Sequence, residues 1–186
     1  MKLSGTALER VLVVVVALVV TIGAIAALSG FFAGRDQAGV SGAGGGPGES
    51  FADLGHAHLR PGQLRPVYNS DPPTSGAHLP VPVPVLRDGA ELNDDQLLQA
   101  LEHGNVVFVY GTHRAPPGLS ALARSIAGPF SPALAAAGQA VILARRSGTT
   151  GLIGLAWAHE VRVSAPNDQL LGAFAQYWLG RGAPGR

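Results

Sequence analysis

The hydrophobic pattern begins with one long apolar run near the N-terminus. Residues 11–33 carry no charge and start as VLVVVVALVV. At about 1.5 Å per residue, a helix of this length crosses a hydrocarbon core of about 30 Å. The apolar core of a signal peptide is shorter, about 7 to 15 residues, although Ala24 and Ala26 resemble the small residues of a cleavage site. The pattern therefore favours an uncleaved single-pass transmembrane helix over 11–33, with a cleaved signal peptide as the alternative.

The charges beside this run predict its orientation. Lys2, Arg10 and the amino terminus precede it, whereas Arg35 follows it. Positive charges favour the cytoplasmic side of a membrane. We therefore expect residues 1–10 in the cytoplasm and the C-terminal part outside it, anchored at the cell membrane.

A Gly-rich stretch separates the apolar run from the rest of the chain. Residues 34–50 include the string SGAGGGPGES and have very few apolar side chains. Such a composition cannot offset chain entropy by burial, so it predicts a flexible linker. The remaining residues, 51–186, are enough for one extracytoplasmic domain with a single core.

The periodicity of this domain predicts a mixture of helices and strands. We expect helices over 94–103, 119–127 and 167–179, and strands over 106–110, 140–144, 152–157 and 161–163. This order predicts an α+β fold in which helices flank a small mixed sheet. The run of strand, helix, two strands and helix resembles the C-terminal part of a thioredoxin-like fold. The segment before it is rich in Pro, which cannot occupy a central strand, so side chains have to hold that segment in place.

Composition narrows the chemistry that the domain can perform. The chain has no Cys, 13% charged residues and a net charge of +1. The lack of Cys excludes disulfides, thiol nucleophiles and thiolate metal sites, and near-neutrality leaves no basic surface for nucleic acid. No GxSxG string surrounds Ser70 or Ser75, so a serine hydrolase is not favoured either. Carboxylate and imidazole chemistry remain.

Histidines supply the strongest chemical pattern. His56 and His58 stand at i and i+2, and an extended backbone projects such side chains to one side, where they can converge on one cation. His78 follows a turn-rich string, and His103 ends the helix that is expected over 94–103. Imidazole suits Zn and Cu. The predicted metal ligands are therefore His56, His58, His78 and His103.

Simpler roles are open to several of these residues. His103 in a last helical turn would be stabilised by the helix dipole, and His78 could bond a carbonyl within a turn. His113 and His159 lie at the ends of expected strands, which favours a surface or core role for both. Glu102 is about 100° from His103 around the helix, so we expect it to be a capped or solvated carboxylate rather than a ligand.

Two strings carry a family resemblance. NSDPPTSGAH over 69–78 and LEHG over 101–104 resemble an uncharacterised bacterial family called domain of unknown function 3105, whose members have one N-terminal membrane helix. The resemblance runs from about residue 55 to residue 178. It implies no established activity, but it implies family-typical positions for five residues: His56, His58, His78, Glu102 and His103.

Two departures from the family pattern matter. Ala77 replaces an expected Pro, and Gln99 stands where the helix often carries His one turn before LEHG. The second change breaks an HxxEH string, which weakens the case for a zinc hydrolase.

Three hypotheses for function follow. The first is a membrane-anchored domain that binds Cu or Zn through its histidines, with no catalytic residue assigned. The second is a structural or protein-interaction module of the cell envelope, without metal, in which the same motifs fix an irregular segment. The third and least favoured is a metal-dependent hydrolase with Glu102 as general base. The sequence identifies no protein partner.

Overall fold

The computed structural model describes residues 13, 21, 45–83 and 90–185 of the chain. The segment 1–10 that is expected in the cytoplasm, nearly all of the transmembrane helix expected over 11–33 and most of the expected linker lie outside the described residues. Within the described residues, no helix is both long and apolar enough to cross a membrane. The chain separates into two compact units, Met1–Val40 and Ser41–Arg186, of which the second is described below.

A mixed five-stranded sheet with helices on both faces forms the domain, as the α+β prediction requires. Its strands are β1 (Glu49–Ser50), β2 (Val106–Tyr110), β3 (Val141–Arg145), β4 (Leu152–Ala156) and β5 (His159–Val163), in the order β1-β5-β4-β2-β3. Strands β2 and β3 are parallel, and the other pairs are antiparallel. The helices are α2 (Asp94–Glu102), α3 (Leu119–Ala127), α4 (Pro132–Ala136) and α5 (Gln169–Trp178).

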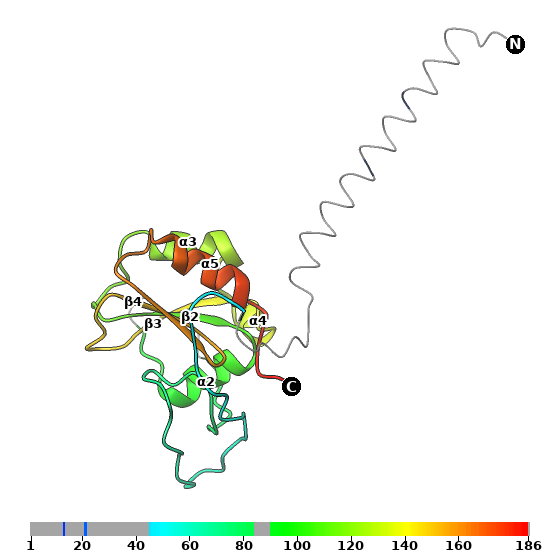
Figure 1. Ribbon diagram of the computed structural model, residues 1–186, viewed down its shortest axis with the longest axis vertical. Helices are drawn as coiled ribbons and strands as arrows, with labels where there is room; N and C mark the ends of the chain where they lie inside the picture. Colours follow the sequence, from blue (N-terminus) through cyan, green and yellow to red (C-terminus); the bar gives the residue numbers. More distant parts are fainter. Residues whose placement is uncertain (1–12, 14–20, 22–44, 84–89, 186) are drawn as a thin grey trace, which may run out of the picture. The chain divides into compact units, whose positions relative to one another are not determined.

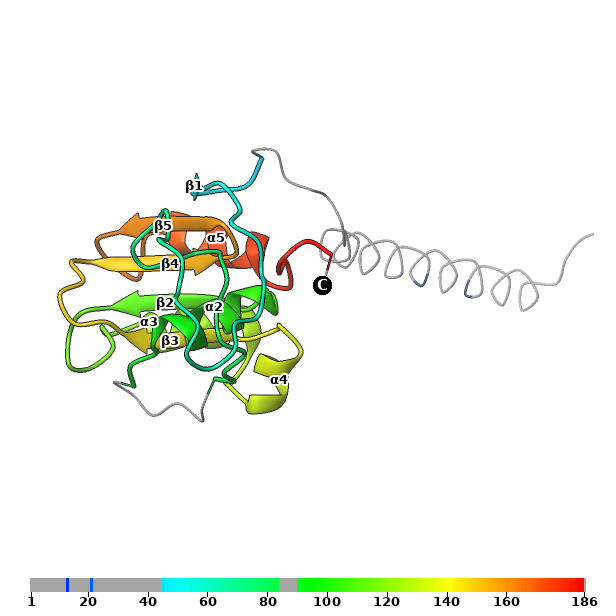
Figure 2. The same cartoon turned by 90° about the horizontal axis from the view of Figure 1, so that it is seen from below.

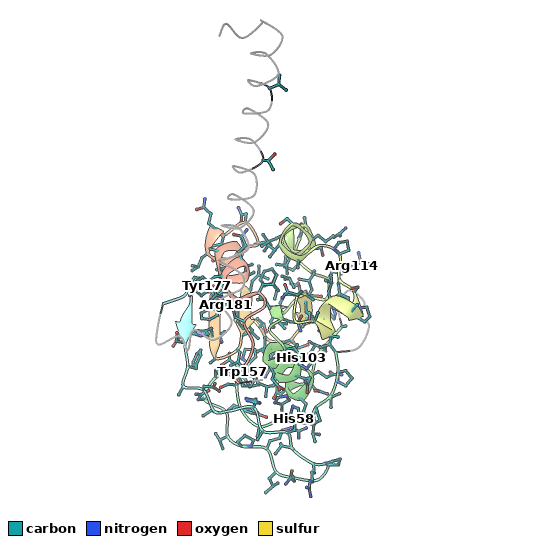
Figure 3. The ribbon with its side chains drawn as sticks, turned by 90° about the vertical axis from the view of Figure 1, so that its right-hand side faces the viewer. His58, His103, Arg114, Trp157, Tyr177 and Arg181 are labelled. Carbon is teal, nitrogen blue, oxygen red and sulfur yellow. The ribbon has the colours of Figure 1, made fainter. Side chains whose placement is uncertain are left out.

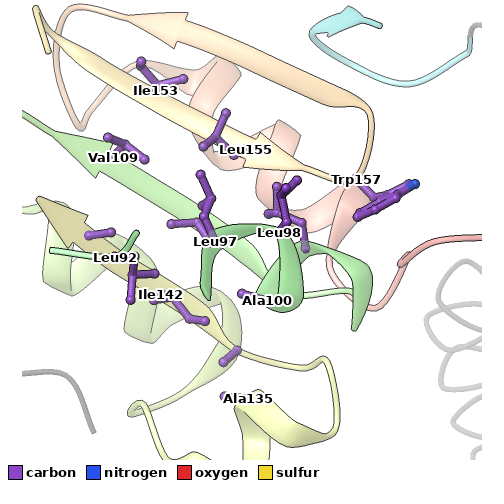
Figure 4. Close-up of a cluster of buried hydrophobic side chains, with 14 of the residues drawn as sticks. Leu92, Leu97, Leu98, Ala100, Val109, Ala135, Ile142, Ile153, Leu155 and Trp157 are labelled. Atoms are coloured by element: carbon purple, nitrogen blue, oxygen red, sulfur yellow. The ribbon is translucent and has the colours of Figure 1, made fainter. Parts of the chain in front are cut away.

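Two hydrophobic layers hold the helices on the sheet. Helices α3 and α5 lie on one face and α2 lies on the other (Figure 1). The layer under α2 packs Leu97, Leu98 and Leu101 of this helix against Val107, Val109 and other residues of the sheet (Figure 4). Because β2 is covered on both faces, all five of its residues are buried, which explains its unbroken apolar run VVFVY.

Both ends of α2 are fixed by specific contacts. Asn93 and Gln96 form a capping box at its start, each side chain accepting a bond from the other's backbone N–H. At its end, Gly104 has a φ of +99°, a conformation that favours glycine. The side chain of Asn105 donates to the carbonyls of Ala100 and Ala135. These contacts fix the last turn of α2, which carries Glu102.

An irregular segment, residues 51–83, lies on the α2 side of the domain (Figure 2). It is held by polar contacts, as its Pro-rich composition predicts. The Tyr68 hydroxyl donates to the carbonyl of Ala77, and the Asn69 amide donates to the carbonyl of Ala52. The carbonyl of Thr74 accepts from the N–H of Ala158, in the turn between β4 and β5. The segment is thereby tied both to itself and to the sheet.

The domain begins earlier than predicted. Residues 45–50 were assigned to the linker, but Glu49 and Ser50 form β1 on the edge of β5, and Trp178 donates its indole N–H to the carbonyl of Pro47. Gly46 lies so close to Trp178 that a Cβ there would be 2.4 Å from the indole ring. The boundary between linker and domain, expected at residue 51, therefore lies earlier in the chain. Gly46 allows the backbone to pack closely against Trp178 instead of serving as a flexible linker.

Two shorter features also differ from the prediction. Helix α4 was not expected, although Ser131 caps it and Pro132 stands in its first turn, both of which favour a helix start. At the opposite sheet edge, Glu91 forms an isolated bridge with Arg145 of β3. A single turn of helix and a single bridge are too short to produce a periodic pattern in the sequence.

Candidate metal site

Glu102, the last residue of α2, lies at the centre of the candidate site. Its side chain is only 4% exposed, yet three imidazoles face its two carboxylate oxygens. Oε2 is 3.1 Å from Nε2 of His58 and 3.2 Å from Nε2 of His78, whereas Oε1 is 3.7 Å from Nδ1 of His56. The expectation that Glu102 is solvated was therefore wrong.

His78 is fully buried, and its protonation pattern is constrained by a hydrogen bond. Its Nδ1 is 3.0 Å from the carbonyl oxygen of Gly76, which can only accept, so Nδ1 carries a proton. In the neutral ring, Nε2 then presents a lone pair, and this atom has no hydrogen-bond partner among the described residues. A lone pair facing the carboxylate of Glu102 is unfavourable unless a proton or a cation lies between them.

His58 and His78 are brought together by backbone pairing between two distant parts of the irregular segment. The N–H of His78 donates to the carbonyl of Ala57, and the N–H of Leu59 donates to the carbonyl of His78. This parallel bridge places the two rings 5.4 Å apart, edge to face. The His58 side chain is 47% exposed, so the site opens to solvent on this side.

The spacing of the ligand atoms suits a metal ion. One ligand atom from each of His58, His78 and Glu102 lies within 4.8 Å of the other two. Tetrahedral Zn with bonds of about 2.0 to 2.1 Å has ligand atoms about 3.4 Å apart. The contacts of Oε2 with the two imidazoles are close to that spacing, and two imidazoles with one carboxylate suit divalent Zn or Cu. The three residues could therefore hold an ion, with a fourth position left for water or another ligand.

A comparison with known protein families agrees with the two sequence strings. Residues 63–185 match the family described as Protein of unknown function (DUF3105). The chain belongs to this family. No curated protein and no solved structure matches it. The resemblance to the DUF3105 family is thus confirmed, and it carries no activity of its own.

The region matched by the DUF3105 family contains only part of the site. His78, Glu102 and His103 lie inside residues 63–185, whereas His56 and His58 precede them. The match is thus narrower at its N-terminal end than the resemblance we inferred from about residue 55, and it extends past residue 178.

The structure does not bring His103 to the other three predicted ligands. Its Nε2 accepts from the amide of Gln99 at 2.8 Å, and its Nδ1 donates to the carbonyl of Ala136 at 3.2 Å. Both ring nitrogens of His103, which is labelled at the end of α2 in Figure 3, are therefore occupied by these contacts. The turn of about 100° between consecutive helical residues separates the two side chains, and it is Glu102 that faces His58 and His78.

Trp157 is a residue of the site that the sequence did not indicate. It follows β4, it is 4% exposed, and its ring centroid lies 6.4 Å from that of His56 and 6.5 Å from that of His78. Its indole N–H has no hydrogen-bond partner among the described residues. Trp157 therefore forms an apolar wall beside the imidazoles and supplies a natural fluorescent reporter there.

A buried carboxylate on the same side of α2 supports the position of His78. Asp95 accepts from the Leu79 N–H at 3.0 Å and pairs with both Nε and Nη2 of Arg65. Burial alone would raise the pKa of Asp95, but the hydrogen bond from Arg65, the Leu79 N–H and the Arg65 charge outweigh it and lower this pKa. Asp95 thus stays ionised and fixes the backbone next to His78.

Proposed function

We propose that this chain is a membrane-anchored protein whose extracytoplasmic domain binds one divalent Zn or Cu ion through His58, His78 and Glu102. The observation that carries the proposal is the contact of 3.2 Å between Nε2 of His78 and Oε2 of Glu102. The proton of His78 is held on Nδ1 by Gly76, so the two facing atoms are both acceptors when the ring is neutral. A divalent cation between them resolves this conflict.

The rival to a metal ion is a second proton on His78. That proton would give a charged imidazolium in a side chain that has no solvent exposure, with Glu102 as its counter-ion. A metal ion also recruits His58, whose Nε2 lies at 3.1 Å from the same oxygen, and so uses all three groups at once.

The membrane part of the proposal rests on the sequence alone. The uncharged run 11–33 is long enough to span a bilayer, and the charges around it favour a cytoplasmic N-terminus. We also propose that the domain is thioredoxin-like, and the strand order β5-β4-β2-β3 and the parallel pairing of β2 with β3 support this. Because the chain has no Cys, we propose no thiol redox activity for it.

A protein-interaction module without metal is the second candidate. It is favoured by the tip of the irregular segment, where Leu64 is 93% exposed and Val67 is 95% exposed. A hydrolase is the least supported candidate, because a Glu102 that binds the ion cannot also act as the general base.

Metal analysis of the purified full chain, prepared without an added His tag, tests the first candidate. We expect one Zn or Cu ion per chain, and its loss in Glu102→Gln and His78→Ala. Cu²⁺ should quench the fluorescence of Trp157, and Trp157→Phe should remove that response but retain the ion. His103→Ala and His113→Ala serve as matched controls that should bind normally.

Two results would contradict the metal proposal. One is a wild-type chain that takes up no ion from Zn²⁺ or Cu²⁺ solutions, and the other is full occupancy in Glu102→Gln. Either would leave the interaction module as the better account. Circular dichroism of each variant shows whether a lost ion reflects a lost ligand or a lost fold.

A further inference from the structure

The candidate site has a buried half and an exposed half. His78 and Glu102 have side chains that are 0% and 4% exposed, whereas those of His56 and His58 are 37% and 47% exposed. Both exposed imidazoles come from one short stretch of the irregular segment. An ion from solvent therefore reaches the exposed half first.

The two oxygens of Glu102 serve different imidazoles. Oε2 faces His58 and His78, which form the compact group of three, and Oε1 faces His56 at 3.7 Å. His56 is not a member of the compact group, so it is not placed as a fourth ligand of the same ion. It instead makes a second, looser pair with the other end of the same carboxylate.

We infer that His56 and Oε1 of Glu102 form an outer subsite through which a divalent ion enters and leaves the inner site. This inference rests on the proposed function. A hydrated ion first exchanges water for Nδ1 of His56 and for Oε1. It then exchanges Oε1 for Oε2 of the same carboxylate, releases Nδ1 of His56, and exchanges further water for Nε2 of His58 and Nε2 of His78. The ion keeps its charge throughout, and each ligand that joins it replaces one that leaves.

The structure gives this path a physical advantage. A buried pair such as His78 and Glu102 can bind an ion only after the ion has lost most of its water, which is costly in one step. An exposed imidazole lets the ion lose water one molecule at a time while it remains attached. The site then suits an ion that binds and dissociates, rather than a structural ion that stays bound permanently.

Binding kinetics separate an entry residue from a permanent ligand. An entry residue lowers the barrier in both directions, so His56→Ala should slow association and dissociation by a similar, several-fold factor and leave Kd nearly unchanged. A permanent ligand would behave differently, because its loss should weaken affinity by more than about tenfold, mostly through faster dissociation.

The experiment is stopped-flow mixing of Cu²⁺ with the full chain, followed by Trp157 fluorescence, with dissociation measured on mixing with excess EDTA. His113→Ala, on an exposed loop, is the matched control and should keep both wild-type rates. Equal slowing of both rates in His56→Ala supports the entry subsite. Unchanged rates, or a weakened Kd with unchanged association, would overturn it while leaving the inner site intact. If the wild-type chain binds no Cu²⁺ or Zn²⁺, the proposed function fails and this inference fails with it.

Discussion

The sheet with its helices and the irregular segment 51–83 are stabilised in opposite ways. The sheet is stabilised by two hydrophobic layers, to each of which many buried side chains contribute. The irregular segment packs Tyr68 and Val83 against one of these layers, and the rest of its hold comes from single polar contacts such as that of Asp95 with Leu79. One lost contact therefore matters little to the shape of the sheet but can displace a ligand in the segment. The candidate site lies where the two regions meet, with Glu102 from the first and His58 and His78 from the second.

The largest effect on stability is expected from a cavity in the hydrophobic layer between α2 and the sheet. Leu98 of α2 is fully buried between the helix and the sheet. Leu98→Ala should lower the free energy of unfolding by about 2 to 5 kcal/mol, as buried Leu truncations do. Urea unfolding followed by circular dichroism measures this change. Leu170→Ala, at a side chain that is 43% exposed, is the control and should change stability by less than about 0.5 kcal/mol.

A smaller effect that is specific to the irregular segment is expected at Asp95. Asp95→Asn removes the charge that pairs with Arg65 and weakens the bond to Leu79, a loss of about 1.5 to 3 kcal/mol for hydrogen bonds to a charged group. The N–H of Leu79 should exchange with solvent faster, while the amides of β2 keep their protection. The matched control is Asp94→Asn. Asp94 directly precedes Asp95 in α2 and pairs with Arg146 at the surface. Equal loss of protection in β2 would show that the two regions are not independent.

The smallest effect concerns the edge of the sheet and depends on pH. His159 of β5 stacks on Trp178 and contacts the Ser50 hydroxyl at 3.0 Å, and burial lowers the pKa of this imidazole. The unfolded chain therefore binds a proton more readily than the folded chain does. Stability from this group is fully present above the ordinary His pKa of about 6.5 and is lost as pH falls through the lower folded value.

The Tm of the wild-type chain should accordingly fall on acidification below about pH 6.5, and His159→Gln should reduce that dependence. His113→Gln, on an exposed loop, should leave it unchanged. A wild-type Tm that rises as the pH is lowered through this window would contradict the assignment.

The same contrast explains which features the sequence could predict. Strands β2 and β4 and helices α2 and α5 have continuous apolar faces, so their periodicity was sufficient. The site depends on a bridge between His58 and His78, and no local pattern indicates that two irregular stretches will pair. The sequence identified His56, His58 and His78, which lie around Glu102, but it could not tell which side of α2 the irregular segment would cover. The side of α2 that the segment covers decides whether Glu102 or His103 faces the other imidazoles.

The short pieces at the two edges of the sheet have a consequence for how copies of the molecule meet. Residues 49–50 pair with β5, and Glu91 forms a bridge with Arg145 on β3. Exposed strand edges offer unpaired N–H and C=O groups on which a second sheet can build, and natural proteins often cover or interrupt them. Here each outer strand is partly capped by a neighbouring piece of its own chain. These short pieces therefore occupy part of each edge on which a second sheet could build.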